Sequence, residues 1–82
     1  MERSLGDDYD RRMREYLVIY EQGDDGTWGA YSPDVWGVYA AADTREETER
    51  LMREALPAHI EALREAGIEV PEPTHQIEFI AA

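Results

Sequence analysis

Residues 43–67, DTREETERLMREALPAHIEALREAG, carry the one long helical pattern of this 82-residue chain. Thr44 followed three residues later by Glu47 forms a capping box, which marks a helix N-terminus. Apolar residues then recur at spacings of three and four, which predicts an amphipathic helix with one buried stripe. Gly67 suits the position after a helix, so the helix is expected to end at about residue 66. The stripe comprises Leu51, Met52, Ala55, Leu56, Ile60 and Leu63.

Pro57 lies inside this pattern, where it removes one backbone hydrogen bond and clashes with the preceding turn. The helix therefore either kinks at Pro57 or divides into two helices over 44–56 and 57–66. Because the apolar stripe continues in phase across the proline, we expect a kink.

Three short strands precede the helix in the predicted fold. Residues 15–21 (EYLVIYE) are aromatic and β-branched and are apolar on both faces, which is typical of a strand in the middle of a sheet. The turn at 23–26 contains Asp25-Gly26, a pair that accepts positive φ, and 27–32 returns as a second strand. Pro33-Asp34 interrupts that strand, Gly37 permits a bend or bulge, and a third strand is expected over 38–42.

A fourth strand is predicted after the helix, over 75–80 (HQIEFI), beyond the stiff connector VPEP at 70–73. The resulting class is α+β with the element order β-β-β-α-β. A right-handed crossover through the helix makes the fourth strand parallel to the third. Because the first strand requires two neighbours, we expect a four-stranded sheet of order 3-2-1-4, with the helix on one face.

One helix leaves the other face of that sheet uncovered. This face carries one of the two apolar sets of the first strand, with Trp28 or Tyr31 beside it. An exposed apolar face of this kind usually marks an interface. The pattern therefore predicts a homodimer, a higher homo-oligomer or a protein partner.

The composition narrows the classes of partner. Nineteen acidic residues oppose eight basic ones, all arginine, for a net charge of −11. Such a chain repels nucleic acid, whose binding depends on neutralised phosphates, and attracts a basic protein. There is no cysteine, no apolar run long enough for a membrane span and no apolar signal peptide. We therefore expect a cytoplasmic protein that binds neither nucleic acid nor membrane.

The N-terminal residues 1–12 (MERSLGDDYDRR) are highly charged, and we expect a flexible tail followed by a single domain over 13–82. The tail either has no function or becomes ordered on binding, and we favour the first interpretation.

The pattern contains no catalytic constellation, metal site or cofactor motif. The two histidines, His59 and His75, do not have a metal-ligand spacing, and Asp24 and Asp25 are turn formers. Trp36, between Val35 and Gly37, is either a lid on the core or an exposed binding anchor. Tryptophan and tyrosine are frequent interface hot spots.

Pro33-Asp34-Val35-Trp36-Gly37, then Ala40, then Asp43-Thr44-Arg45-Glu46-Glu47, resembles the HicB antitoxin family. The similarity covers about residues 13–80. At four positions of these motifs the chain departs from the family's usual residue. It has Trp36 where the family has proline, Val38 where it has cysteine, Ala42 where it has glycine and Thr48 where it has alanine.

The resemblance implies a partly degraded ribonuclease-H-like domain that binds and neutralises HicA toxins, which are small basic ribonucleases. Many members also carry a DNA-binding module, which we do not expect here because the last predicted strand lies at residues 75–80 of the 82. We therefore expect a non-catalytic antitoxin domain without cofactor or metal. The predicted partner-binding residues are Tyr31, Pro33, Asp34 and Trp36.

Two other hypotheses remain open. The first is that the chain is an orphan homo-oligomeric domain without a toxin. The second is that it retains a small enzymatic or ligand site on the sheet near Glu21, Glu78 or His75.

Overall fold

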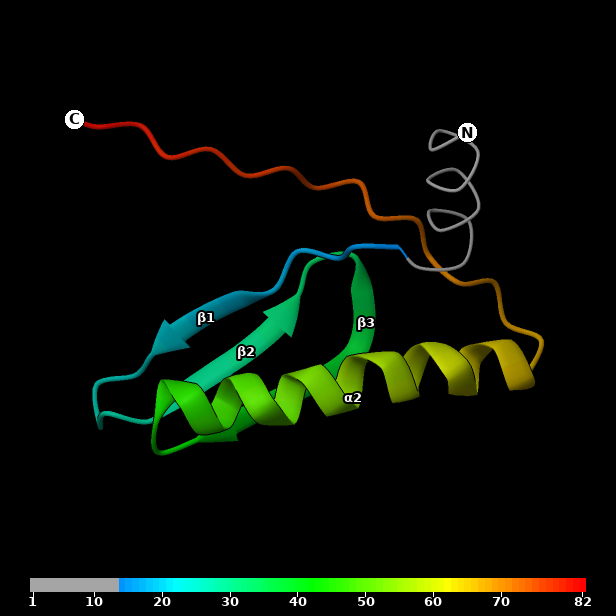
Figure 1. Ribbon diagram of the computed structural model, residues 1–82, viewed down its shortest axis with the longest axis horizontal. Coiled ribbons are helices and arrows are strands. Elements are labelled where there is room, and N and C mark those ends of the chain that lie inside the picture. The colour runs from blue at the N-terminus through cyan, green and yellow to red at the C-terminus, as the bar shows by residue number, and fades with distance from the viewer. Residues whose placement is uncertain (1–13) are drawn as a thin grey trace, which may run out of the picture.

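A computed structural model describes residues 14–82 of the chain. The predictions of a flexible tail over 1–12 and of a domain starting at Met13 concern the region outside these residues. The described chain forms three strands followed by one helix, and the strands make one sheet (Figure 1). In chain order the elements are β1 (Ile19–Gln22), β2 (Trp28–Ser32), β3 (Val35–Ala42) and α2 (Arg45–Glu65).

The sheet is an antiparallel meander of order β1-β2-β3, as the first half of the sequence predicts. Its first turn is closed by a hydrogen bond from the Gly23 N–H to the Thr27 carbonyl at 2.8 Å, with Gly26 at φ +89°. β1 is shorter than the predicted strand because residues 15–18 pair with no neighbour and only Ile19–Gln22 join the ladder.

The β2–β3 connection is tighter than expected. Pro33 and Asp34 alone make the turn, and Ser32 pairs with Val35 directly across it. β3 therefore starts at Val35 instead of residue 38. The pairing shifts register between Tyr31 and Ser32, and Gly37 lies at φ +88°, so the predicted irregularity at this position is confirmed.

The two helix ends agree with the prediction. The Thr44 hydroxyl oxygen accepts a hydrogen bond from the Glu47 N–H at 3.1 Å. The reciprocal half of the capping box is absent, because the Glu47 carboxylate binds Arg50 instead. At the other end, the Gly67 and Ile68 N–H groups donate to the Arg64 and Leu63 carbonyls, a Schellman cap.

α2 is one continuous helix over 21 residues and includes Pro57, so the alternative of two helices is excluded. The proline ring is exposed on the outer side of the helix. Because proline has no N–H, the helical hydrogen bond to the Arg53 carbonyl is lost. Leu56 before the proline and Ile60 after it both pack on the core, so the helix presents the same face to the sheet on both sides of Pro57.

The core lies between α2 and one face of the sheet, mostly against β3 and β2. Small side chains on the sheet, Ala30 and Ala40, allow the helix to approach closely, and Met52 fills the centre at 1% exposure. Tyr20 on β1 reaches the first helical turn, where the Arg45 guanidinium lies 5.0 Å from its ring centroid. The buried apolar residues are Ala30, Val35, Val38, Ala40, Met52 and Ile60.

The prediction of a fourth strand over 75–80, and with it the order 3-2-1-4, is wrong for the described chain. Residues 68–82 form no regular secondary structure, and beyond His75 the chain continues as an extended segment that joins no sheet (Figure 1). The physical cause lies just before the segment. Pro71 and Pro73 restrict the connector, and Thr74 and His75 are bound to Asp34, so the chain leaves the domain at the β2–β3 turn without meeting a strand.

Candidate functional site: the open sheet face and the Asp34 clamp

The face of the sheet opposite α2 carries a row of apolar residues. In the strand register, Ile19, Tyr31 and Tyr39 lie side by side across β1, β2 and β3. Directly opposite residues share a face, and their neighbours Tyr20, Ala30 and Ala40 face the helix. Tyr31 is 36% exposed and Tyr39 is 67% exposed. We call Ile19, Tyr31 and Tyr39 the open face.

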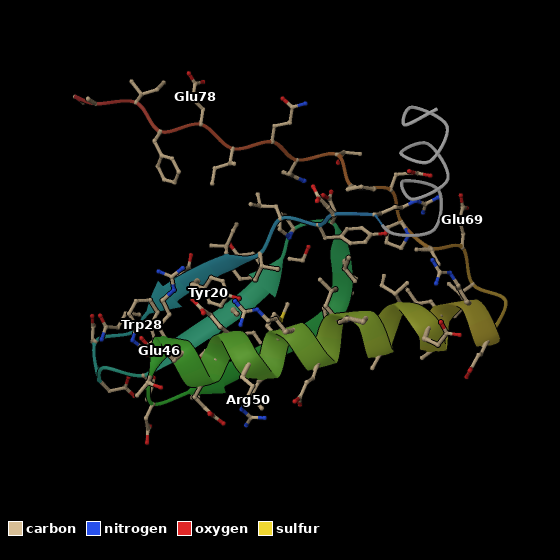
Figure 2. All side chains as sticks on the ribbon, viewed as in Figure 1. Tyr20, Trp28, Glu46, Arg50, Glu69 and Glu78 are labelled. Atoms are coloured by element: carbon tan, nitrogen blue, oxygen red, sulfur yellow. The ribbon has the colours of Figure 1, made fainter. Side chains whose placement is uncertain are left out.

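The sequence predicts that one apolar set of the first strand is left uncovered. The structure agrees, because no element described in residues 14–82 packs on the open face. Of the two aromatic residues considered for it, the structure places Tyr31 there. Trp28 shares the side of Ala30 and lies at the edge of the sheet near Glu46 and the start of α2 (Figure 2). Tyr39, which the sequence analysis did not single out, completes the row.

Trp36 is 90% exposed, so it is not a lid on the core of this chain. It lines a shallow depression of about 470 Å³ together with Tyr31 and Pro33 at the β2–β3 turn. Three of the four predicted partner-binding residues thus lie together. The same depression includes Ser32, whose buried hydroxyl oxygen has no hydrogen-bond partner among the described residues.

Asp34, the fourth predicted residue, lies in the same turn but faces a segment forty positions away in the sequence. Its Oδ2 atom accepts hydrogen bonds from the Thr74 N–H at 3.0 Å and the His75 N–H at 3.3 Å. Its Oδ1 atom accepts from the Thr74 hydroxyl at 2.8 Å and lies 2.7 Å from His75 Nδ1. We call these three residues the Asp34 clamp.

The clamp explains the electrostatic state of Asp34. Its side chain is only 7% exposed, and burial alone raises the pKa of a carboxyl. The hydrogen bonds from Thr74 and His75 outweigh this effect and lower the pKa of Asp34 from 3.8 to about 2. The carboxylate is therefore charged at neutral pH and satisfied within the chain.

Two further contacts attach the same C-terminal stretch to the start of the described chain. The Tyr16 hydroxyl donates to the Pro71 carbonyl at 2.6 Å, and Arg14 lies 3.2 Å from the Glu72 carboxylate. Residues 71–75 are thus held to the domain at three points. No local sequence pattern marks these contacts, since both partners in each pair lie in irregular backbone.

The residues considered for a catalytic or ligand site do not converge. His75 belongs to the clamp, Glu21 is exposed on β1, and Glu78 points away from the sheet on the C-terminal segment (Figure 2). No group of three or more histidine, aspartate or glutamate side chains suited to a metal ion occurs in residues 14–82. His59 lies on α2 against Gly37, whose Cβ position would be 3.3 Å from the imidazole ring.

The described residues thus form a three-stranded meander covered on one face by one capped helix, with Trp36 exposed beside the open face. The family described as "HicB_like antitoxin of bacterial toxin-antitoxin system" matches residues 16–82. The chain belongs to this family.

No curated protein and no solved structure matches the chain. In the part of the chain that the structure describes, α2 is not apolar enough to cross a bilayer.

Proposed function

We propose that the chain is a non-catalytic antitoxin that binds and neutralises a small basic ribonuclease of the HicA type. The observation that carries the proposal is the exposed Trp36 at the depression with Tyr31 and Pro33, on a chain of an antitoxin family. A large aromatic side chain left in water in the free protein gains the most from burial against a partner.

The proposed contact surface is the β2–β3 turn with the adjoining open face. Tyr31 and Pro33 form the apolar floor, and Trp36 inserts into the toxin as the anchor. Asp34 lies in the same turn, but its carboxylate is already bound to Thr74 and His75. A direct hydrogen bond from Asp34 to the toxin therefore requires the Asp34 clamp to open.

Charge supports the class of partner. The net charge of −11 attracts a basic protein over long range and increases its association rate, most strongly at low ionic strength. The proposal sets the pair in the cytoplasm, the compartment in which a ribonuclease toxin meets its RNA.

The test uses a HicA-type protein encoded beside this chain, with cleavage of a defined RNA as the readout. The wild-type chain should abolish cleavage at equimolar ratio and form a stable complex in size-exclusion chromatography. Trp36→Ala should weaken binding by roughly tenfold or more, the usual scale for a hot-spot aromatic residue.

The matched control is Glu61→Ala, which removes an exposed side chain from the outer side of α2 and should leave binding unchanged. A dissociation constant for Trp36→Ala equal to that of the wild type would contradict the proposed contact surface. A chain that forms homo-oligomers and never binds or inhibits the toxin would contradict the antitoxin proposal and support the orphan alternative.

A further inference from the structure

The last seven residues, 76–82 (QIEFIAA), have the composition of a strand but no strand partner. Ile77, Phe79 and Ile80 are 63%, 89% and 76% exposed. Among the described residues, none makes a hydrogen bond to this segment, which runs out beside the sheet as an extended chain (Figure 1). Three large apolar side chains within four residues of an extended segment are costly to leave in water. They indicate a binding partner.

The sheet has an unpaired edge at β1, and this edge is apolar like the C-terminal segment. β1 pairs with β2 on one side only, so the backbone groups of its outer edge are free to accept another strand. Residues 16–20 are apolar on both sides, with Val18 and Tyr20 toward the helix and Ile19 on the open face. Residues 76–82 are also apolar on both sides when extended, because Ile77 and Phe79 project to one side and Ile80 to the other.

The contacts at residues 71–75 fix where the segment starts. The Asp34 clamp, the Tyr16–Pro71 hydrogen bond and the Arg14–Glu72 ion pair hold its base to its own domain. Beyond His75 the chain projects away, and seven extended residues span roughly 23 Å. An anchored base lowers the entropy lost when the free part pairs with a second molecule.

One chain therefore carries both an unpaired strand and an unpaired edge. We propose that residues 76–82 of one copy add to the outer edge of β1 in a second copy, and that the second copy returns the same contact. Reciprocal exchange closes a two-fold dimer and leaves neither component unpaired. The segment carries one charged side chain, Glu78, and β1 carries one, Glu21, so most of the net charge of −11 lies outside the proposed contact.

The first test measures mass by light scattering after size-exclusion chromatography of the full chain alone. The wild type should have the mass of two chains. The double variant Ile77→Asp, Phe79→Asp should have the mass of one chain, with its helix signal in circular dichroism retained. The control is Ala58→Asp, Ala62→Asp, which adds the same charges at exposed positions of α2 and should remain dimeric.

A second test separates exchange from pairing within one chain. Because the natural chain has no cysteine, two single variants, Glu21→Cys and Glu78→Cys, are mixed and treated with a short bis-maleimide. Exchange predicts a covalent pair containing one chain of each variant. No mixed pair, together with an internal cross-link in the double-cysteine chain, would overturn the proposal.

A monomeric wild type, or a dimer unaffected by the changes at Ile77 and Phe79, would also overturn it. Both tests omit the toxin. Failure of strand exchange therefore leaves the antitoxin proposal standing, and failure of toxin binding leaves strand exchange standing.

Discussion

The Tyr39 side chain lies across Gly29 on the neighbouring strand, so that a Cβ atom at Gly29 would be 2.6 Å from the Tyr39 hydroxyl oxygen. The next contacts, 3.3 and 3.5 Å, are also to the tyrosine ring. A glycine inside a strand leaves a bare patch of backbone, and here an aromatic ring covers it from the adjacent strand. This pair fixes the orientation of the most exposed residue of the open face.

Gly29→Ala should therefore move Tyr39 while changing stability little. The clash involves the free end of an exposed side chain, and alanine loses less backbone entropy than glycine in a strand. We expect the free energy of unfolding to change by less than about 1 kcal/mol. The near-ultraviolet circular dichroism of the tyrosines should change. In the Tyr39→Ala background, Gly29→Ala should become stabilising, and a loss of stability there would contradict the explanation.

Acid should release the Asp34 clamp only at very low pH. Because the pKa of Asp34 is lowered to about 2 in the folded chain, its contribution to stability is fully present above the unfolded value of 3.8. The contribution is lost as the pH falls through about 2. Carboxyl carbon NMR of Asp34 should show a midpoint near that value, and the Thr74 amide resonance should shift with it.

Asp34→Asn is the control for this titration, since it removes the charge but keeps the shape. The Thr74 amide of this variant should show no transition between pH 4 and 2. An Asp34 midpoint near 3.8 in the wild type would show that the clamp is not formed in solution.

Thr44→Ala should destabilise the domain. It removes the hydroxyl oxygen that accepts from the Glu47 N–H at 3.1 Å, and the reverse capping bond from Glu47 is absent. The expected loss is about 1 kcal/mol in the free energy of unfolding, measured with urea. Thr44→Ser retains the acceptor and should stay within a few tenths of a kcal/mol of the wild type. Equal losses in both variants would contradict a capping role.

Pro57→Ala should stabilise the domain. The substitution restores the N–H that donates to the Arg53 carbonyl and removes the ring clash, while the exposed ring contributes little packing. We expect a gain of about 1–3 kcal/mol in the free energy of unfolding. Pro73→Ala, outside the helix, is the matched change and should give no such gain. A destabilised Pro57→Ala would show that the proline has a packing role.

The helix and the three-stranded meander could be predicted because their signals are local. Thr44 and Gly67 mark the helix ends, Asp25-Gly26 marks the first turn, and the apolar stripe on α2 carries the phase of the helix through Pro57. Each signal depends on neighbours within a few residues, which is the range over which a single sequence is informative.

The C-terminal region could not be predicted because the deciding contacts are distant in the chain. Residues 75–80 have a strand-like composition, yet hydrogen bonds from Thr74 and His75 to Asp34 direct the segment away from its own sheet. Tyr31, Pro33 and Trp36 cluster because they lie within six residues of each other at one turn, whereas the position of Tyr39 depends on the strand register. Composition alone does not specify such pairings.

The order of the elements along the chain bears on how the protein folds. Every strand of the sheet pairs with its immediate neighbour in sequence, and α2 packs on strands that precede it, so the buried core needs nothing after residue 70. Such local connectivity favours rapid folding. The three strands and α2 can therefore pack together before residues 76–82 find a partner. Folding of the core and pairing of this segment are separate steps, and an unfolded core is not needed for the second.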